Sequence, residues 1–244
     1  MKQKQNVIKI KKNSLQDWVE SILWAFVFAM IIRNYTFQNF KIPSSSMEST
    51  LLIGDYLVAN KIKYFFKDPE RDDIVTFRYP ADPLEPEPRE RYIKILAPVY
   101  WDKEKNFLTW YEKKNVVKRV IGLPGDVVEV KDKDVYINGE LFKKDYEQYL
   151  DNRTRPREYS HIQWNSKLSQ GQKEIIMGSR DNIGPIVVPE GKYFVLGDNR
   201  DYSADSRYWG LLDREDITGT PLIIFFSRSD DGENRWERSF KLIK

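Results

Sequence analysis

The 244-residue sequence contains no cysteine and only one histidine, and these two absences exclude several kinds of chemistry. Without cysteine, neither a disulfide framework nor a cysteine nucleophile is possible, and the redox compartment stays undetermined. A serine–histidine–aspartate triad would have to use His161, which lies in the polar stretch 159–171, where the lack of strand or helix periodicity predicts a loop. The other base available to a serine nucleophile is a lysine with a lowered pKa.

An excess of charge of either sign is also missing. The chain has 40 lysines and arginines against 37 aspartates and glutamates, which gives a net charge of +3. This balance does not indicate a nucleic-acid partner on electrostatic grounds. Hydrophobic residues make up 41%, enough for a core, and 32% charged residues fit a soluble surface around it. The length allows one large domain or two small ones.

The sequence has no long uncharged apolar run. The uncharged part of its N-terminal apolar segment covers only residues 21–32, whereas a membrane span needs about 20 residues. Extending the segment to 15–37 reaches that length but includes Asp17, Glu20 and Arg33, near the ends, where long side chains can reach the membrane surface. A cleaved signal peptide, a buried amphipathic helix and an uncleaved membrane anchor are the three possible interpretations.

The anchor is the interpretation that we favour. A signal peptide would need a small-residue cleavage site, and residues 32–36 are bulky or polar. The basic tail, residues 1–14, would then stay cytoplasmic by the positive-inside rule. The anchor would cover residues 15–37, and residues 38–244 would form an extracytoplasmic domain at the cell membrane, in contact with lipid.

After this segment, short runs of β-branched and aromatic residues alternate with turn signals, which is typical of a mainly β domain. The dipeptide Asn138-Gly139 is a strong hairpin signal. The stretches 84–114 and 143–183 lack a clear pattern and are predicted to be insertions. We expect strands at 56–62, 74–79, 115–122, 127–130, 134–137, 140–142, 185–188, 193–196, 221–226 and 240–243.

Two places carry candidate chemistry. Ser44, Ser45 and Ser46 form a run directly after Ile42-Pro43, and proline stiffens the backbone that leads into them. In the expected strand 115–122, Lys118 shares its face with two valines, and Arg119 points the opposite way. Burial on such a face would lower the pKa of the lysine. The residues alone leave open the alternative that Lys118 reaches the surface.

Three segments together resemble the bacterial type I signal peptidases, membrane-bound serine–lysine endopeptidases that remove signal peptides. They are residues 42–51 with Gly54-Asp55, residues 117–126 and residues 197–207, and residues 71–80 resemble a fourth segment of the family. The resemblance implies an antiparallel β catalytic domain, no cofactor and no metal. Ser46, directly before Met47, matches the nucleophile, and Lys118 matches the general base.

The resemblance also implies supporting roles for other residues. Ser44 matches a hydroxyl that helps the Ser46 N–H to form the oxyanion hole. Ser203 matches a serine that orients the lysine, and Asp205 and Arg207 match a supporting ion pair. Within the same segment, Asp198 and Asn199 are expected to hold the shape of the loop.

The implied substrates are secretory preproteins with small residues at positions −1 and −3. Such a substrate would add a β-strand along Asn115, Val116 and Val117 and along Ile42 and Pro43. A calcium loop at 197–207 is rejected on the sequence, because the third and sixth positions from Asp198 are occupied by Arg200 and Ser203.

Several residues depart from the family pattern or compete with this assignment. Ser45 stands where glycine is usual, Ser49 where proline is usual, and Tyr202 where asparagine is common. Lys94 follows Tyr92-Ile93 and resembles the start of a lysine segment, but the residues after it do not continue the pattern. Two other functions stay open: a serine–lysine protease of the LexA type, and an anchored binding protein without catalysis.

Overall fold

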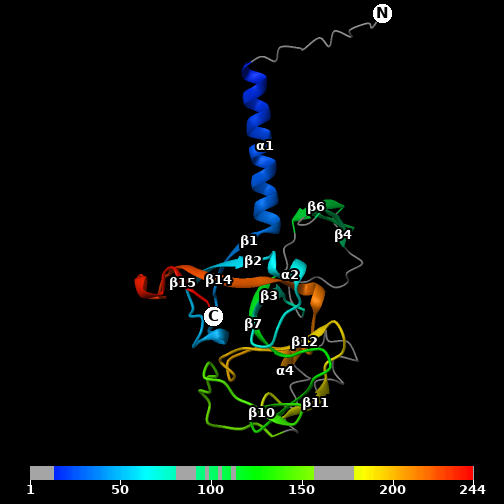
Figure 1. Ribbon diagram of the computed structural model, residues 1–244, viewed down its shortest axis with the longest axis vertical. Coiled ribbons are helices and arrows are strands. Elements are labelled where there is room, and N and C mark those ends of the chain that lie inside the picture. Colours follow the sequence, from blue (N-terminus) through cyan, green and yellow to red (C-terminus); the bar gives the residue numbers. More distant parts are fainter. Residues whose placement is uncertain are drawn as a thin grey trace, which may run out of the picture.

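The computed structural model describes residues 14–80, 92–96, 99–103, 106–110, 114–156 and 179–243. Its N-terminal helix, α1 (Ser14–Tyr35), projects away from a body that consists mainly of β-strands (Figure 1). The helix leads into β1 (Phe37–Lys41) at the edge of the body. Apolar side chains of α1 such as Trp18, Trp24 and Phe26 are exposed. These side chains of α1 therefore do not pack into the hydrophobic core of the body.

The structure does not support the membrane span predicted for residues 15–37. In the part of the chain that the structure describes, no helix is both long enough and apolar enough to cross a membrane. Asp17 and Glu20 interrupt the apolar sequence near the start of α1, and Arg33 lies near its end. The helix ends at Tyr35, and Phe37 already belongs to β1.

The main sheet has eight described strands, in the order β1-β2-β14-β3-β7-β12-β13, with β15 beside β14. The strand pairs are antiparallel, so the prediction of a mainly β, antiparallel fold is confirmed. Besides β1, its strands are β2 (Asp55–Asn60), β3 (Ile74–Arg78), β7 (Asn115–Gly122), β12 (Lys192–Leu196), β13 (Leu212–Asp213), β14 (Ile217–Ser227) and β15 (Lys241–Leu242).

A second sheet has the order β10-β9-β8-β11. The predicted hairpin joins β9 to β10, and Asn138 and Gly139 both have positive φ angles, 54° and 84°. Two central residues with positive φ are what a tight hairpin turn of this type requires. The strands of this sheet are β8 (Val127–Lys131), β9 (Asp134–Ile137), β10 (Glu140–Phe142) and β11 (Ile183–Val187).

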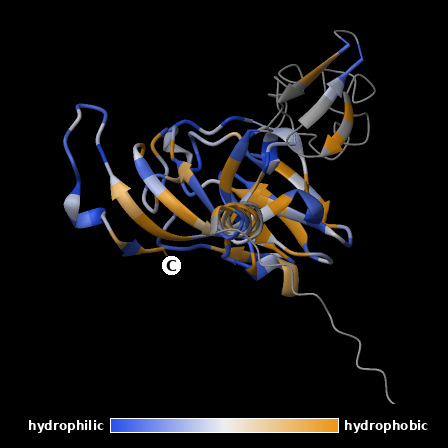
Figure 2. Ribbon diagram, turned by 90° about the horizontal axis from the view of Figure 1, so that it is seen from above, coloured by the Kyte–Doolittle hydropathy of each residue, from blue (hydrophilic) through white to orange (hydrophobic). Residues whose placement is uncertain are grey.

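Residues 84–114, which the sequence predicts to be an insertion, contain three strands. They are β4 (Tyr92–Leu96), β5 (Val99–Asp102) and β6 (Phe107–Trp110), and they form a separate antiparallel sheet. Figure 2, which looks along α1, shows this sheet beside the body. Short helices complete the described elements: α2 (Lys63–Phe66), α4 (Ser206–Trp209), η1 (Ser45–Met47), η4 (Arg214–Asp216) and η5 (Trp236–Arg238).

Two clusters of buried side chains hold the body together. The larger cluster joins the main sheet to the β8–β11 sheet and includes Phe77, Phe194 and Trp209, whose ring lies 5.7 Å from that of Phe77. The smaller cluster lies under η1 and consists of Ile42, Met47, Leu51, Leu57, Ile74, Val117 and Ile224. Because the smaller cluster joins the serine run to β7, it positions the candidate site.

Candidate active site

Ser46 lies in the single turn of η1, and its neighbours fix that turn. The side chains of Met47 and Leu51 are only 1% and 0% exposed, and burial of such a side chain contributes about 1.5–3 kcal/mol. The N–H of Leu51 donates to the carbonyl of Met47 at 2.8 Å. Ser46 stands beside these anchors and is itself buried. The apolar residues that follow the serine run thus determine where the hydroxyl of Ser46 points.

Lys118 lies on β7, and its Nζ is 2.6 Å from the Oγ of Ser46, although 72 residues separate the two. Its Nζ also donates to the carbonyl of Val117 at 3.1 Å. The lysine is only 4% exposed, so the alternative of a lysine that reaches the surface is wrong. Strand β7 thereby brings a buried amine to a buried hydroxyl.

Burial lowers the pKa of Lys118 from its ordinary value of 10.5 to about 8. The loss of hydration is the largest cause, since it disfavours the charged form. The negative charges of Asp205 and Asp198 act in the opposite direction and keep the pKa from falling further. At neutral pH, about a tenth of the lysine is therefore an uncharged amine that can accept a proton.

The hydroxyl of Ser44 lies 3.5 Å from that of Ser46, and Ser44 is exposed. This distance is long for a hydrogen bond between two hydroxyls. The two side chains are close because Ser44 is extended, with φ −140° and ψ 157°, directly before η1 begins. The structure thus brings Ser44 next to Ser46, on the open side of the site.

The loop after β12 closes the other side of Ser46. The N–H of Asn199 donates to the carbonyl of Ser46 at 3.2 Å. A Cβ added to Gly197 would lie 2.4 Å from that same carbonyl and 2.3 Å from the Oγ of Ser203. No side chain fits in such a space. Gly197 is a site residue whose role sequence reasoning missed, although the residue itself belongs to a matched segment.

Asp205 and Arg207 form a buried ion pair at 2.8 Å, and Asp205 also accepts from the N–H of Gly197 at 3.1 Å. Burial on its own would raise the pKa of Asp205, but the charge of Arg207 together with hydrogen bonds to the carboxylate holds the pKa below the ordinary value. Ser203 is buried beside Gly197, and its hydroxyl lies close enough to Asp205 to help lower the pKa of that carboxyl. Its hydroxyl makes no hydrogen bond to Lys118 among the described residues.

A second buried ion pair joins β7 to the same loop. Arg119 donates to both carboxylate oxygens of Asp198, each at 2.8 Å, and the two side chains are 4% and 1% exposed. Arg119 follows Lys118 directly, so β7 presents the candidate base on one face and this pair on the other. Alternation along the strand predicted the direction of Arg119, but not its partner.

One edge of β7 is open beside Lys118 among the described residues. Strand β3 pairs with β7 from Asn115 to Arg119, whereas β12 pairs with it only from Arg119 onward. The N–H and carbonyl of Val120 bond toward the β3 side, to Asp73 and Asp72. Because these groups alternate in direction along a strand, those of Asn115 and Val117 point to the open edge.

The other residues expected to bind substrate differ in whether their backbone N–H and carbonyl groups are free to pair with an added strand. The backbone groups of Val116 point toward β3, by the same alternation. The N–H of Ile42 donates to Asp55 and its carbonyl accepts from Gly54, each at 2.9 Å, and its side chain is buried. Pro43 has no N–H to give. The backbone groups of Ile42 are therefore already hydrogen-bonded within the body, and its role in substrate binding stays a prediction.

The sequence offered two residues that compete with Lys118 for the role of base. His161 lies outside the described residues. Lys94 is on β4, opposite Tyr100 of β5, in the separate three-stranded sheet. Among the residues that the structure describes, no group of three histidine, aspartate or glutamate side chains is placed to hold a metal ion.

Comparison with known proteins gives the family. Residues 15–226 match the family described as "Signal peptidase, peptidase S26", and the chain therefore belongs to it. The chain is accordingly a serine endopeptidase of the signal peptidase family.

Two relatives agree with this membership. The signal peptidase I of Bacillus licheniformis is 36% identical over 88% of this chain and 91% of that protein. The signal peptidase I of Aquifex aeolicus is 32% identical over 84% of this chain and 82% of that protein. A solved signal peptidase I from Enterococcus faecalis is 28% identical and covers 63% of this chain and 97% of that chain, with a TM-score of 0.34.

Proposed function

We propose that this signal peptidase removes N-terminal signal peptides from secretory preproteins, with Ser46 as the nucleophile and Lys118 as the general base. The observation that carries the proposal is the buried contact of 2.6 Å between the Nζ of Lys118 and the Oγ of Ser46. A serine hydroxyl is a weak nucleophile until an adjacent base takes its proton. In this chain the amine that can do so has a pKa of about 8.

The reaction begins when neutral Lys118 accepts the proton of Ser46 and Oγ attacks the scissile carbonyl carbon. The tetrahedral intermediate then collapses, the C–N bond breaks, and the protonated lysine gives its proton to the leaving amine. Water, activated by the same lysine, hydrolyses the acyl-enzyme and restores the Ser46 hydroxyl. The backbone N–H of Ser46 and the hydroxyl of Ser44 would hold the oxyanion, and one such donor is worth about 2.7–4 kcal/mol.

The substrate would bind as an extra strand on the open edge of β7. The backbone groups of Asn115 and Val117 supply the hydrogen bonds, as in other cases of strand addition. Lys118 follows directly, so pairing along this edge leads the chain of the substrate to the nucleophile. Small side chains at positions −1 and −3 of the preprotein, which point to the same face of its strand, fit this arrangement.

Membrane attachment through α1 is part of the proposal. The 22 residues of α1 extend about 33 Å at 1.5 Å per residue, close to the roughly 30 Å of a hydrocarbon core. Its charged residues Asp17, Glu20 and Arg33 lie toward the two ends. An isolated helix with exposed apolar side chains needs an apolar environment. The body, with the dyad, would then lie on the extracytoplasmic side.

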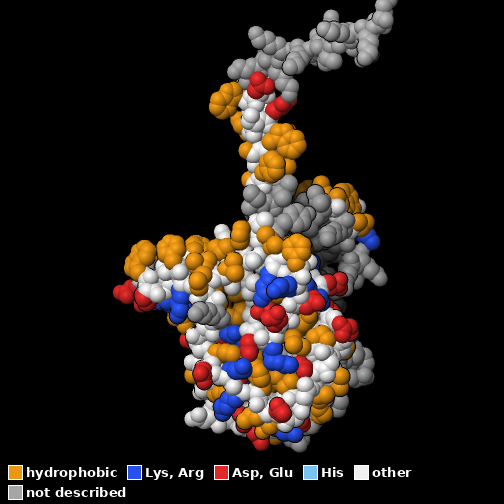
Figure 3. Space-filling view, viewed as in Figure 1, with side chains coloured by type: hydrophobic (Ala, Val, Ile, Leu, Met, Phe, Trp, Pro, Cys, Tyr) orange, Lys and Arg blue, Asp and Glu red, His pale blue; other side chains and the backbone are white. Residues whose placement is uncertain are grey.

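An apolar rim on the body supports this attachment. Exposed apolar side chains lie along the edge of the body from which α1 emerges, and Figure 3 shows them in orange. Exposed patches of this kind mark contacts with membranes or other proteins. The rim consists of Phe37, Phe65, Phe66, Leu222, Trp236, Phe240 and Leu242.

Cleavage of a preprotein with an alanine-x-alanine site, in detergent micelles, tests the activity. We expect the wild-type chain to cut at that site, and Ser46→Ala and Lys118→Met to lose cleavage by at least about 10⁴-fold. Ser45→Ala, a change of the neighbouring serine, is the matched control and should cleave. If wild type and both variants are folded and none cleaves, the chain is a binding protein instead. Equal cleavage by wild type and Ser46→Ala would move the nucleophile to Ser44 or Ser45.

Alkaline carbonate extraction of membranes tests the attachment. Wild-type chain should stay in the membrane pellet, whereas the double variant Ile22→Lys/Phe26→Lys should be released, because two charges in the middle of α1 are costly in hydrocarbon. Phe66→Lys on the rim leaves α1 intact and should stay in the pellet. Release of the wild-type chain would contradict the anchor.

A further inference from the structure

A segment without regular structure passes over the back of the site. It runs from Tyr146 to Asp151, after β10, and is called the strap here. The sequence predicts that these residues belong to the insertion 143–183, which lies outside the segments that resemble the family. The strap nevertheless contacts all three segments that make up the site, and the following paragraphs take these contacts in turn.

The first contact is with the turn that follows Ser46. The Oγ of Ser49 donates to the carbonyl of Tyr146 at 2.6 Å. Ser49 has a φ of +93°, which is unusual for a residue with a side chain. Proline, with φ near −65°, cannot adopt this conformation. The chain thus departs from the usual proline at the residue whose hydroxyl ties this turn to the strap.

The second contact is with β7. The guanidinium of Arg119 lies 3.9 Å from the ring centroid of Tyr146, a stacked cation–π arrangement. The hydroxyl of Tyr146 donates to the Oδ1 of Asp72 at 2.6 Å, and Arg119 donates to the backbone carbonyl of Asp72 at 2.8 Å. Tyr146 therefore covers the Arg119–Asp198 ion pair and fixes the residue next to Lys118.

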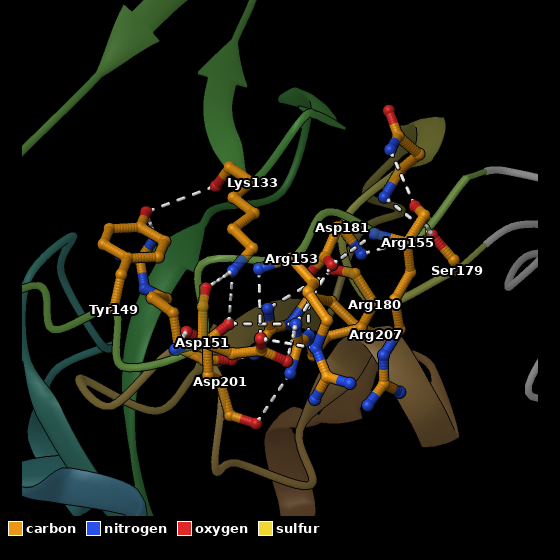
Figure 4. Close-up of polar contacts among 12 residues, drawn as sticks. Lys133, Tyr149, Asp151, Arg153, Arg155, Ser179, Arg180, Asp181, Asp201 and Arg207 are labelled. Carbon is orange, nitrogen blue, oxygen red and sulfur yellow. Dashed lines mark hydrogen bonds and ion pairs between the residues drawn. The ribbon is translucent and has the colours of Figure 1, made fainter.

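The third contact is with the loop after β12. Gln148 pairs with Asn199 in parallel: its N–H donates to Asp198 at 2.8 Å, and its carbonyl accepts from Arg200 at 2.9 Å. The end of the strap is held at Asp201, whose Oδ2 accepts from the N–H of Asp151 at 2.7 Å. Figure 4 shows Asp151 and Asp201 within the surrounding group of arginines and Lys133.

We propose that Tyr146 and Ser49 are positioning residues of the peptidase reaction, because the strap clamps the turn of Ser46, the strand of Lys118 and the loop of Asn199 against one another. Neither residue touches Ser46 or Lys118 directly. Tyr146 acts through Arg119, and Ser49 acts through the turn that carries the nucleophile. The inference deepens the proposed function and rests on it.

Steady-state cleavage of the alanine-x-alanine preprotein tests the clamp. Tyr146→Ala should lower kcat about 10- to 100-fold, because small misplacements of reacting groups cost that much, while KM stays unchanged because the open edge of β7 is intact. Tyr146→Phe keeps the ring over Arg119 and should recover most of the activity. Ser49→Ala should lower kcat in the same way, to a smaller extent.

The pH profile separates this role from simple loss of stability. Without the ring of Tyr146, Arg119 holds Asp198 less firmly, and the negative charge of Asp198 acts more strongly on Lys118. The acid limb of the profile should therefore move to higher pH in Tyr146→Ala. Tyr149→Ala, which changes the other tyrosine of the strap, whose hydroxyl contacts Lys133 and Glu147, is the matched control and should leave the limb unmoved. A folded Tyr146→Ala with wild-type kcat and pH profile overturns the proposal.

Hydrogen exchange tests the clamp without any substrate. Peptides that cover residues 44–51 should exchange faster in Tyr146→Ala than in the wild type, and no faster in Tyr149→Ala. If the wild-type chain cleaves no preprotein, the proposed function fails, but faster exchange in Tyr146→Ala alone would still support the clamp. Equal exchange in wild type and Tyr146→Ala would overturn it.

Discussion

The Oγ1 of Thr50 donates a hydrogen bond of 2.6 Å to the Oδ2 of Asp198. The same carboxylate receives both hydrogen bonds of the Arg119 ion pair. One buried carboxylate therefore connects the turn after Ser46, the strand of Lys118 and the loop after β12. Three segments that lie far apart in the sequence are held in place by this shared acceptor.

The shared carboxylate predicts that variants of Asp198 and Thr50 differ in how much unfolding free energy they lose. Asp198→Asn should cost about 3–5 kcal/mol of unfolding free energy, since it leaves the buried charge of Arg119 without its partner. Thr50→Val keeps the shape of the side chain and removes one hydrogen bond, so it should cost only about 0.5–1.5 kcal/mol. Urea unfolding of both variants checks this order. Equal losses would mean that the carboxylate is not the central connection.

The pH dependence of cleavage should follow the ionisation of Lys118. The pKa of this lysine is lowered to about 8, and only the neutral amine can accept the proton of Ser46. The value of kcat/KM should therefore rise with pH up to about 8 and level off above it. Below that value it should fall about tenfold per pH unit. Initial rates between pH 6 and pH 10 measure this limb, and a flat profile would contradict a lysine base.

Replacing the buried lysine should stabilise the fold. The pKa of Lys118 is about 8 in the folded chain, against 10.5 for an ordinary lysine. Between pH 8 and pH 10.5 the lysine is protonated in the unfolded chain but neutral in the folded chain, so the free energy of unfolding rises with pH across this window. Below pH 8 the lysine is charged in both states, and the folded chain bears the whole free-energy cost of burying that charge. Lys118→Met should add about 2–3 kcal/mol at pH 7 and lose cleavage.

The gain in Lys118→Met should shrink as the pH approaches 10.5. Urea unfolding at pH 7 and pH 10 measures it. Lys63→Met is the control: that side chain is 30% exposed and pairs with Asp73 at 2.7 Å, so its replacement should bring no gain in stability at pH 7. If Lys118→Met and wild type are equally stable at pH 7, the amine carries no burial cost and its lowered pKa is in doubt.

Gly197 should tolerate no side chain. A Cβ at this position would lie 2.4 Å from the carbonyl of Ser46 and 2.3 Å from the Oγ of Ser203, so one of the two must move. Gly197→Ala should therefore lower kcat by about 100-fold or more through displacement of Ser46. Gly139→Ala, in the hairpin turn, is the control: it strains a positive φ and should cost some stability, but a Cβ there meets no atom within 4 Å, so kcat should stay unchanged. Normal cleavage by Gly197→Ala would show that the loop can move away from Ser46.

Much of the fold follows from local patterns. The bounds of β7, Asn115–Gly122, were predictable from its β-branched residues. The two valines that share a strand face with Lys118 indicated that its amine is poorly hydrated, as it is in the structure. The membership of the signal peptidase family, which the sequence motifs predict, is confirmed. The roles of Ser46 and Lys118 in cleavage stay predictions until the variants are measured.

Other features depend on partners that the local sequence does not reveal. Phe40 resembles an aromatic residue at a membrane surface, but it lies on β1, which pairs with β2, and packs against the smaller core cluster. The strap looks polar and irregular because its partners are distant. Glu147, for example, is buried against Arg200, at 3.0 Å. The local sequence around Glu147 cannot reveal a partner that is distant in the chain. For this reason the strap was predicted to be part of an insertion.

The open edge of β7 has a consequence for where a substrate is cut. A strand added at Asn115 and Val117 is aligned in discrete steps, since hydrogen bonds repeat every two residues. A slip of one residue would turn every side chain of the substrate to the wrong face. Errors of cleavage should therefore fall two residues from the correct bond. In the proposed binding mode, the accuracy of cleavage therefore depends on how the substrate strand aligns with β7.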